Sequence, residues 1–173
     1  MRAAPKPPCA GFTLPEIMIT VAVLGILTTL AVPNFRQLLR NYEVRGAAEA
    51  VASGLQRARG EAVSRNASVQ FVLGSGTSWT VSVVGGATID SRSSSDSPNA
   101  TMTAVASDLA TAATTLTFNN IGLVVANADT SQPLRRVTFT ASGASETLRV
   151  EVGAGGGARV CDPSLPSSNA RAC

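Results

Sequence analysis

The most unusual chemical group in this sequence is the carboxylate of Glu16, because it lies near the start of an otherwise uncharged apolar stretch, Phe12–Pro33. As a helix this stretch is about 33 Å long, enough to cross a hydrocarbon core of about 30 Å. A charge inside lipid costs at least about 2.5 kcal/mol. A carboxylate here is therefore either a solvated group at the membrane edge or a functional group with a partner.

Few other residues of the sequence indicate catalytic chemistry. There is no histidine, which excludes histidine-based triads, general bases and metal ligands. No paired carboxylate motif and no phosphate-binding glycine loop is present, so a membrane-anchored enzyme is disfavoured. We predict no catalytic residue, no cofactor and no metal site.

Two of the three cysteines, Cys161 and Cys173, lie near the C-terminal end, whereas Cys9 precedes the apolar stretch. In an oxidising compartment the C-terminal pair predicts one disulfide that closes a short loop. The alternative is two free thiols. A zinc site would need two further ligands, which makes it the weaker interpretation.

The formal charge of +3 is weak evidence for a nucleic-acid partner. Arg2 and Lys6 precede the apolar stretch, and the chain without them has 12 basic against 11 acidic side chains. Only 4% of the residues are aromatic, and small and β-branched residues dominate the second half. This composition favours an extracytoplasmic β-rich domain behind an anchor.

One long helix is expected to hold Glu16 and the apolar stretch, from about Phe12 to about Arg65 with Asn66 as its C-cap. Gly25 and Pro33 weaken it locally. Beyond Pro33 the apolar residues recur every three to four positions, at Val44, Ala48, Val51, Leu55, Ala58 and Ala62. We therefore expect residues 12–33 to span a membrane and residues 34–66 to pack an apolar stripe on the rest of the chain.

From Ala67 onwards the apolar pattern changes to a period of two, which predicts strands. We expect Gly85–Gly86 and Asp90–Asn99 to be loops. The predicted fold class is α+β, with the helix packed on a C-terminal antiparallel sandwich of two sheets in residues 67–173. The expected strands lie near 69–73, 79–83, 101–106, 115–118, 123–125, 136–141, 147–152 and 158–161.

The segment Cys9–Met18 resembles the prepilin cleavage and methylation motif of type IV pilins and type II secretion pseudopilins. The resemblance implies that residues 1–11 are a leader, that prepilin peptidase cuts between Gly11 and Phe12, and that Phe12 is N-methylated. It also implies that Glu16 pairs with the amino group of a neighbouring subunit during filament assembly. Pro15 departs from the usual aliphatic residue, but a proline in the first helical turn loses no internal hydrogen bond.

Residues 55–66 and 153–173 resemble the GspH/FimT group of minor pilins and pseudopilins. The implied protein is a single-pass inner-membrane subunit with a periplasmic C-terminal domain. It joins other pilins in a type IV pilus or a type II secretion pseudopilus, with the initiating tip as one position that the resemblance suggests. Charge counting favours the opposite orientation, because Arg36, Arg40 and Arg45 follow the span.

Some members of that group bind DNA through a Gly-Arg-x-Arg motif, which gives an alternative function in DNA uptake during transformation. The corresponding residues here are 156–159, and only Arg159 of the two arginines is present. No stacking aromatics accompany the arginines, so solvated surface charges are the simpler interpretation. The candidate DNA contacts are Arg159, Arg149, Arg171, Arg135 and Arg136.

Overall fold

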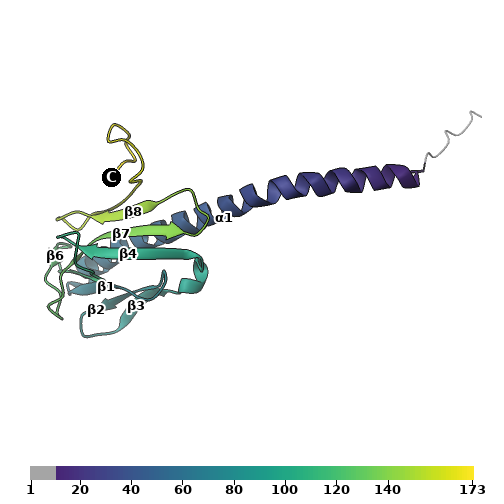
Figure 1. The fold of residues 1–173 in the computed structure, drawn as a ribbon. Helices are drawn as coiled ribbons and strands as arrows, with labels where there is room; N and C mark the ends of the chain where they lie inside the picture. Colours follow the sequence, from purple (N-terminus) through teal and green to yellow (C-terminus); the bar gives the residue numbers. More distant parts are fainter. Residues whose placement is uncertain (1–10) are drawn as a thin grey trace, which may run out of the picture. The chain divides into compact units, whose positions relative to one another are not determined.

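The computed structural model describes residues 11–173, and its first element is the long helix α1, Leu14–Arg65 (Figure 1). Thr13 precedes it, and its carbonyl accepts the amide hydrogens of Glu16 and Ile17. The helix ends where Asn66 adopts a positive φ of 50° and the Ala67 amide donates to the Ala62 carbonyl. This is a left-handed helix C-terminus of the Schellman type, so the predicted cap is confirmed within one residue.

The chain divides into two units, the first ending at Arg36 and the second comprising Gln37–Cys173. In the first unit the described side chains of the helix are exposed, and an 18-residue window has a mean hydropathy of 2.0. By length and composition this helix is able to cross a membrane. The hydroxyls of Thr20, Thr28 and Thr29 donate to helix carbonyls three residues earlier, which suits an apolar medium because these three donors are paired within the helix.

The second unit contains two antiparallel sheets. Sheet A has the strand order β3-β2-β1-β5-β6, and sheet B has the order β4-β7-β8-β9. The strands of sheet A are β1 Val69–Leu73, β2 Trp79–Val83, β3 Thr88–Arg92, β5 Thr115–Phe118 and β6 Val124–Val125. Those of sheet B are β4 Ala100–Ala106, β7 Leu134–Ala141, β8 Leu148–Val152 and β9 Ala158–Cys161, and the 3-10 helix η1, Ser94–Asp96, precedes β4.

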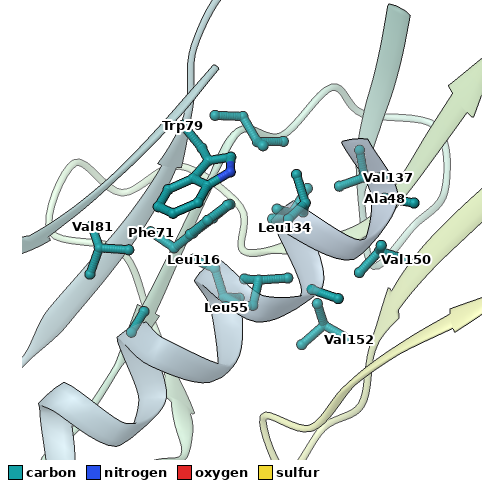
Figure 2. Packing of buried hydrophobic residues seen from close by; sticks show 14 of the residues in the cluster. Ala48, Leu55, Phe71, Trp79, Val81, Leu116, Leu134, Val137, Val150 and Val152 are labelled. Atoms are coloured by element: carbon teal, nitrogen blue, oxygen red, sulfur yellow. The ribbon is translucent and has the colours of Figure 1, made fainter. Parts of the chain in front are cut away.

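The apolar stripe of α1 lies in one hydrophobic core with the inner faces of both sheets (Figure 2). Leu55 faces Phe71 and Leu116 of sheet A, while Ala48 lies near Val137 of sheet B. All six residues of the predicted stripe are fully buried: Val44, Ala48, Val51, Leu55, Ala58 and Ala62. The prediction of a helix packed on two antiparallel sheets is therefore confirmed.

One element differs from the sequence-based prediction, because β3, Thr88–Arg92, occupies part of a segment expected to be a loop. β3 is the edge strand of sheet A and pairs only with β2 among the described strands. Its side chains are exposed or half-buried. An edge strand of this kind needs no alternation of apolar residues, so the polar pattern gave no strand signal.

Candidate functional site

The junction between Gly11 and Phe12 lies outside the helix, in a segment without regular secondary structure. The side chain of Phe12 is 79% exposed, and a Cβ atom placed on Gly11 would meet no other atom within 4 Å. Phe12 is thus accessible in a segment without regular secondary structure, which suits a peptidase substrate. The expected leader and Cys9 fall on residues 1–10, which lie outside the described residues.

Glu16 lies in the first turn of α1, and its side chain is exposed. The Thr13 amide approaches Glu16 Oε2 at 3.5 Å, a long contact of the capping-box kind. An acidic group is favourable here because the helix N-terminus carries a partial positive charge. Within residues 11–173 the carboxylate makes no ion pair, so it remains available to a cation on another chain.

Two loops hold α1 at the start of the second unit. In the loop between β7 and β8, Ser145 donates its amide to Asn41 Oδ1 at 3.0 Å, and Glu146 accepts two hydrogen bonds from Arg45 at 2.7 and 2.8 Å. Arg45 lowers the pKa of the Glu146 carboxyl, chiefly through this side-chain hydrogen bond. The Arg45–Glu146 ion pair therefore stabilises the packing of the helix on sheet B most when Glu146 is ionised.

The second loop lies before β4 and holds the same region of the helix from sheet A. Glu43 accepts hydrogen bonds from the backbone and side-chain amides of Asn99, at 3.2 and 3.0 Å. Arg92 of β3 donates to the Gly46 carbonyl at 2.9 Å. These contacts were not predictable, because polar residues in a helix and in a distant loop carry no pairing signal.

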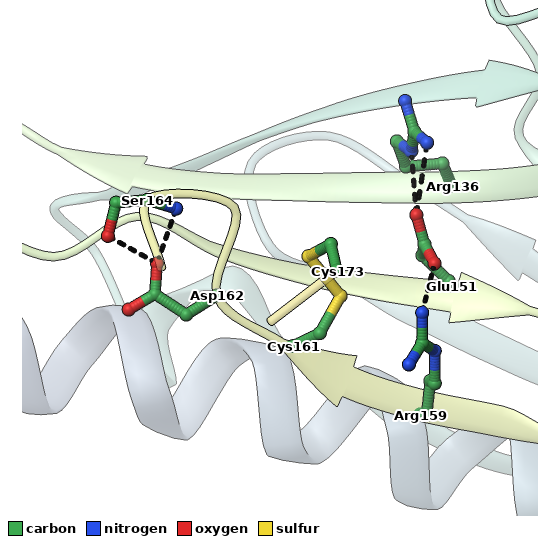
Figure 3. Close-up of a disulfide and its surroundings, with 7 residues drawn as sticks. All are labelled: Arg136, Glu151, Arg159, Cys161, Asp162, Ser164 and Cys173. Atoms are coloured by element: carbon green, nitrogen blue, oxygen red, sulfur yellow. Dashed lines mark hydrogen bonds and ion pairs between the residues drawn. A yellow bond between two sulfur atoms is a disulfide. The ribbon is translucent and has the colours of Figure 1, made fainter. Parts of the chain in front are cut away.

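The disulfide joins Cys161, the last residue of β9, to Cys173, with a Cα–Cα distance of 5.1 Å (Figure 3). The intervening tail folds back, so that the Asp162 amide donates to the Arg171 carbonyl and the Cys173 amide donates to the Asp162 carbonyl. Asp162 also accepts the amide and hydroxyl of Ser164, which lowers the pKa of its carboxyl. These contacts fix the tail beside the edge of sheet B.

Three of the five candidate arginines share the outer face of sheet B. Strand register places Arg136 and Arg159 on either side of Glu151, and Arg149 follows two residues from Glu151 on the same face. Glu151 accepts hydrogen bonds from Arg136 at 3.0 and 3.2 Å and from Arg159 at 3.0 Å (Figure 3). Burial raises the pKa of Glu151, but these two guanidinium groups outweigh it and the net shift is downward.

The remaining two candidate arginines lie elsewhere: Arg135 is exposed at the start of β7, and Arg171 is in the disulfide-closed tail. The Nε atom of Arg149 is buried and has no hydrogen-bond partner among residues 11–173. One carboxylate thus shares the outer face of sheet B with three guanidinium groups. The five arginines do not form a single cluster.

Three features of this chain together define the pilin-like class of proteins. They are an accessible glycine–phenylalanine junction, an apolar helix with a carboxylate in its first turn, and an antiparallel domain packed on the same helix. The chain belongs to the family described as type II transport protein GspH, whose model matches residues 47–164. The prokaryotic N-terminal methylation motif matches residues 6–32. These findings confirm the resemblance to the GspH/FimT group, so the protein is a minor pilin or pseudopilin that carries a methylation motif.

Two solved structures of the type IV minor pilin FimU from Pseudomonas aeruginosa are similar to this chain at 20% sequence identity. One match covers 74% of this chain and 92% of that chain with a TM-score of 0.51, and it supports the α+β pilin fold. The other covers 72% and 94%, with a TM-score of 0.49. No curated protein matches the sequence. The family and fold are those of structural filament subunits, and at this identity the match with the TM-score of 0.51 is evidence for the fold alone.

Proposed function

We propose that this protein is a minor subunit of a pilus-like filament, made as a precursor and matured at its N-terminus. Prepilin peptidase cuts between Gly11 and Phe12 and methylates Phe12, and residues 12–33 then hold the chain in the inner membrane as the anchor. Residues 34–66 continue the helix into a periplasmic domain formed by residues 67–173. The disulfide between Cys161 and Cys173 supports this location, because disulfides persist in the oxidising periplasm.

The observation that carries the proposal is the free carboxylate of Glu16, placed five residues beyond Gly11 at the start of a membrane-length helix. In a lone subunit a charged carboxylate in lipid is costly. In a filament it pairs with the N-terminal amino group of a neighbouring subunit. The assembled state is then favoured, and the pairing fixes the axial register of the subunit.

The proposal predicts different effects for changes at the cleavage junction and at the carboxylate. Mass spectrometry of the protein from cells with active prepilin peptidase should find a chain that begins at N-methylated Phe12. Glu16→Ala, and also the isosteric Glu16→Gln, should leave cleavage intact but reduce the amount in sheared filaments by about tenfold or more, because breaking a desolvated ion pair costs at least about 1.4 kcal/mol. Thr20→Ala on the same helix is the matched control and should behave like the wild type.

Two results would contradict this function. A chain that keeps residues 1–11 in the presence of active peptidase is not a prepilin substrate. A Glu16→Gln variant that enters filaments as well as the wild type needs no carboxylate pairing. The filament itself, a type IV pilus or a type II secretion pseudopilus, is distinguished by the subunits that co-purify with the chain after chemical cross-linking.

DNA binding in transformation is a second candidate, favoured by one observation on the outer face of sheet B. There Glu151 compensates Arg136 and Arg159, whereas Arg149 makes no ion pair within residues 11–173. A phosphate group could therefore contact the Arg149 guanidinium without displacing a carboxylate. A salt-dependent mobility-shift assay with Arg149→Ala and Arg159→Ala, and with Arg65→Ala as control, tests the idea. Each lost phosphate contact should reduce the slope of the logarithm of the binding constant against the logarithm of the salt concentration by about one. If the protein does not bind DNA at low salt, the DNA-binding function is excluded.

A further inference from the structure

A groove of about 220 Å³ lies where the tail and the edge of sheet B meet helix α1. We call it the tail groove; its lining residues are Arg45, Glu49, Glu146, Leu148, Val160, Cys161, Asp162 and Arg171. Sites for small molecules usually measure about 300–1,000 Å³, so the size suits a single side chain better than a cofactor. All of its walls belong to the second unit of the chain.

The apolar surface of the tail groove comes from Leu148 and Val160, which lie at neighbouring positions of β8 and β9. The register pairs Val150 with Val160, so Leu148 and Val160 share the inner face of sheet B. Leu148 is half-buried, and Val160 is 37% exposed. A groove with this surface accepts an aliphatic stem and gains stability from covering it.

The charges around that surface leave one carboxylate, that of Glu49, in the field of Arg45 but without an ion pair within residues 11–173. Arg45 is engaged by Glu146 through two hydrogen bonds. Asp162 is satisfied by Ser164 and lies in the favourable field of Arg171. Glu49 is exposed and makes no ion pair or side-chain hydrogen bond within residues 11–173, so the lining residues carry a net negative charge.

From this apolar surface and the free carboxylate of Glu49 we infer that the tail groove binds one basic side chain, lysine or arginine, of a neighbouring subunit in the filament. The aliphatic stem lies on Leu148 and Val160, and the cation meets Glu49. Lysine and arginine combine an apolar stem with a terminal cation, as the groove requires. The inference deepens the proposed function, because the neighbour is a filament subunit and the disulfide holds the groove's outer wall in place.

The chemistry of the groove can be tested on the full-length protein in detergent micelles, without any filament. N-acetylarginine amide is titrated while backbone amide signals are followed by NMR, and the neutral isostere N-acetylcitrulline amide is the control ligand. Saturable shifts should appear at Glu49, Leu148 and Val160 with the arginine compound only. Glu49→Gln should weaken binding about fivefold, whereas Glu61→Gln, on the same helix but paired with Arg65, should leave it unchanged. Equal shifts with both ligands, or none, would overturn the inference.

The partner is tested in cells that assemble filaments, with a photo-reactive benzoylphenylalanine in place of Ser53, an exposed residue one helical turn beyond Glu49 that does not line the groove. The cross-linked peptide should belong to another pilin-like subunit and contain a lysine or arginine next to the attachment point. Glu49→Gln should reduce the yield several-fold, and Glu61→Gln should not. Cross-linking to a segment without a basic residue would overturn the assignment even if the N-terminus is processed as proposed, whereas an unprocessed chain would contradict the proposed function and leave the NMR result standing.

Discussion

Gly54 gives the sharpest test of how helix α1 is held on its domain. It lies between buried residues of the helix and faces an aromatic pair, Phe71 and Trp79, whose ring centroids are 5.6 Å apart. A Cβ atom added at Gly54 would lie 2.9 Å from Phe71 Cε2 and 3.1 Å from Trp79 Cζ2. Both rings are almost fully buried and have little room to move. Gly60 on the same helix would meet no atom within 4 Å, so it is a matched control.

The two substitutions should therefore have opposite effects on stability. Alanine in place of glycine inside a helix gains about 0.8–1 kcal/mol from the reduced entropy of the unfolded chain and the better helix propensity. At Gly60 no steric clash opposes this gain, so Gly60→Ala should stabilise the protein by about 1 kcal/mol. At Gly54 overpacking costs about 1–3 kcal/mol. Gly54→Ala should then be less stable than Gly60→Ala by about 2 kcal/mol.

Urea unfolding of both variants in detergent, followed by the fluorescence of the only tryptophan, Trp79, measures this difference directly. The midpoint of thermal unfolding should differ in the same direction, by roughly 4–8 °C at about 2–4 °C per kcal/mol. If Gly54→Ala is as stable as Gly60→Ala, the aromatic pair is not fixed against the helix, and close packing does not limit the size of the residue at this position.

Three further changes have expected outcomes of different kinds. Replacing Cys161 and Cys173 by serine should cost at most about 3 kcal/mol for a separation of 12 residues, and limited proteolysis should then cut the released tail. Asn127→Leu should cost about 2–3 kcal/mol by urea unfolding, because this buried amide hydrogen-bonds two threonines of β5. The lowered pKa of Glu146 contributes stability that is complete above its unfolded value of 4.5 and is lost as the pH falls through the folded pKa. Arg45→Met should therefore reduce stability at about pH 7 and have a smaller effect at about pH 3.

The elements with a strong repeating pattern could be predicted from the sequence. The apolar stripe from Val44 to Ala62 predicted both the helix and the face that it buries, because a 3.6-residue period places those side chains on one side of a helix and on no single face of a strand. Asn66 marked the helix end, since asparagine tolerates a positive φ. The alternating strands followed in the same way, and their arrangement as two sheets followed from the fold class.

The features that depend on contacts between distant residues were not predictable. The loops that hold α1 act through polar residues that are far away along the chain, 56 positions in the Asn99–Glu43 pair and 101 in the Arg45–Glu146 pair. β3 carried no apolar alternation, because an edge strand faces solvent. The division of the candidate arginines between sheet B and the tail also required strand register. Sequence alone placed them only in the same third of the chain.

The folded-back tail has a consequence for how this subunit recognises others. β9 is an edge strand of sheet B, and such edges are templates on which another chain can add a strand and aggregate. Backbone pairing between Asp162 and Ala172, locked by the disulfide, places the protein's own chain beside the residue that directly follows β9. The disulfide-closed tail thus ends the strand and shortens the backbone edge that another chain could extend.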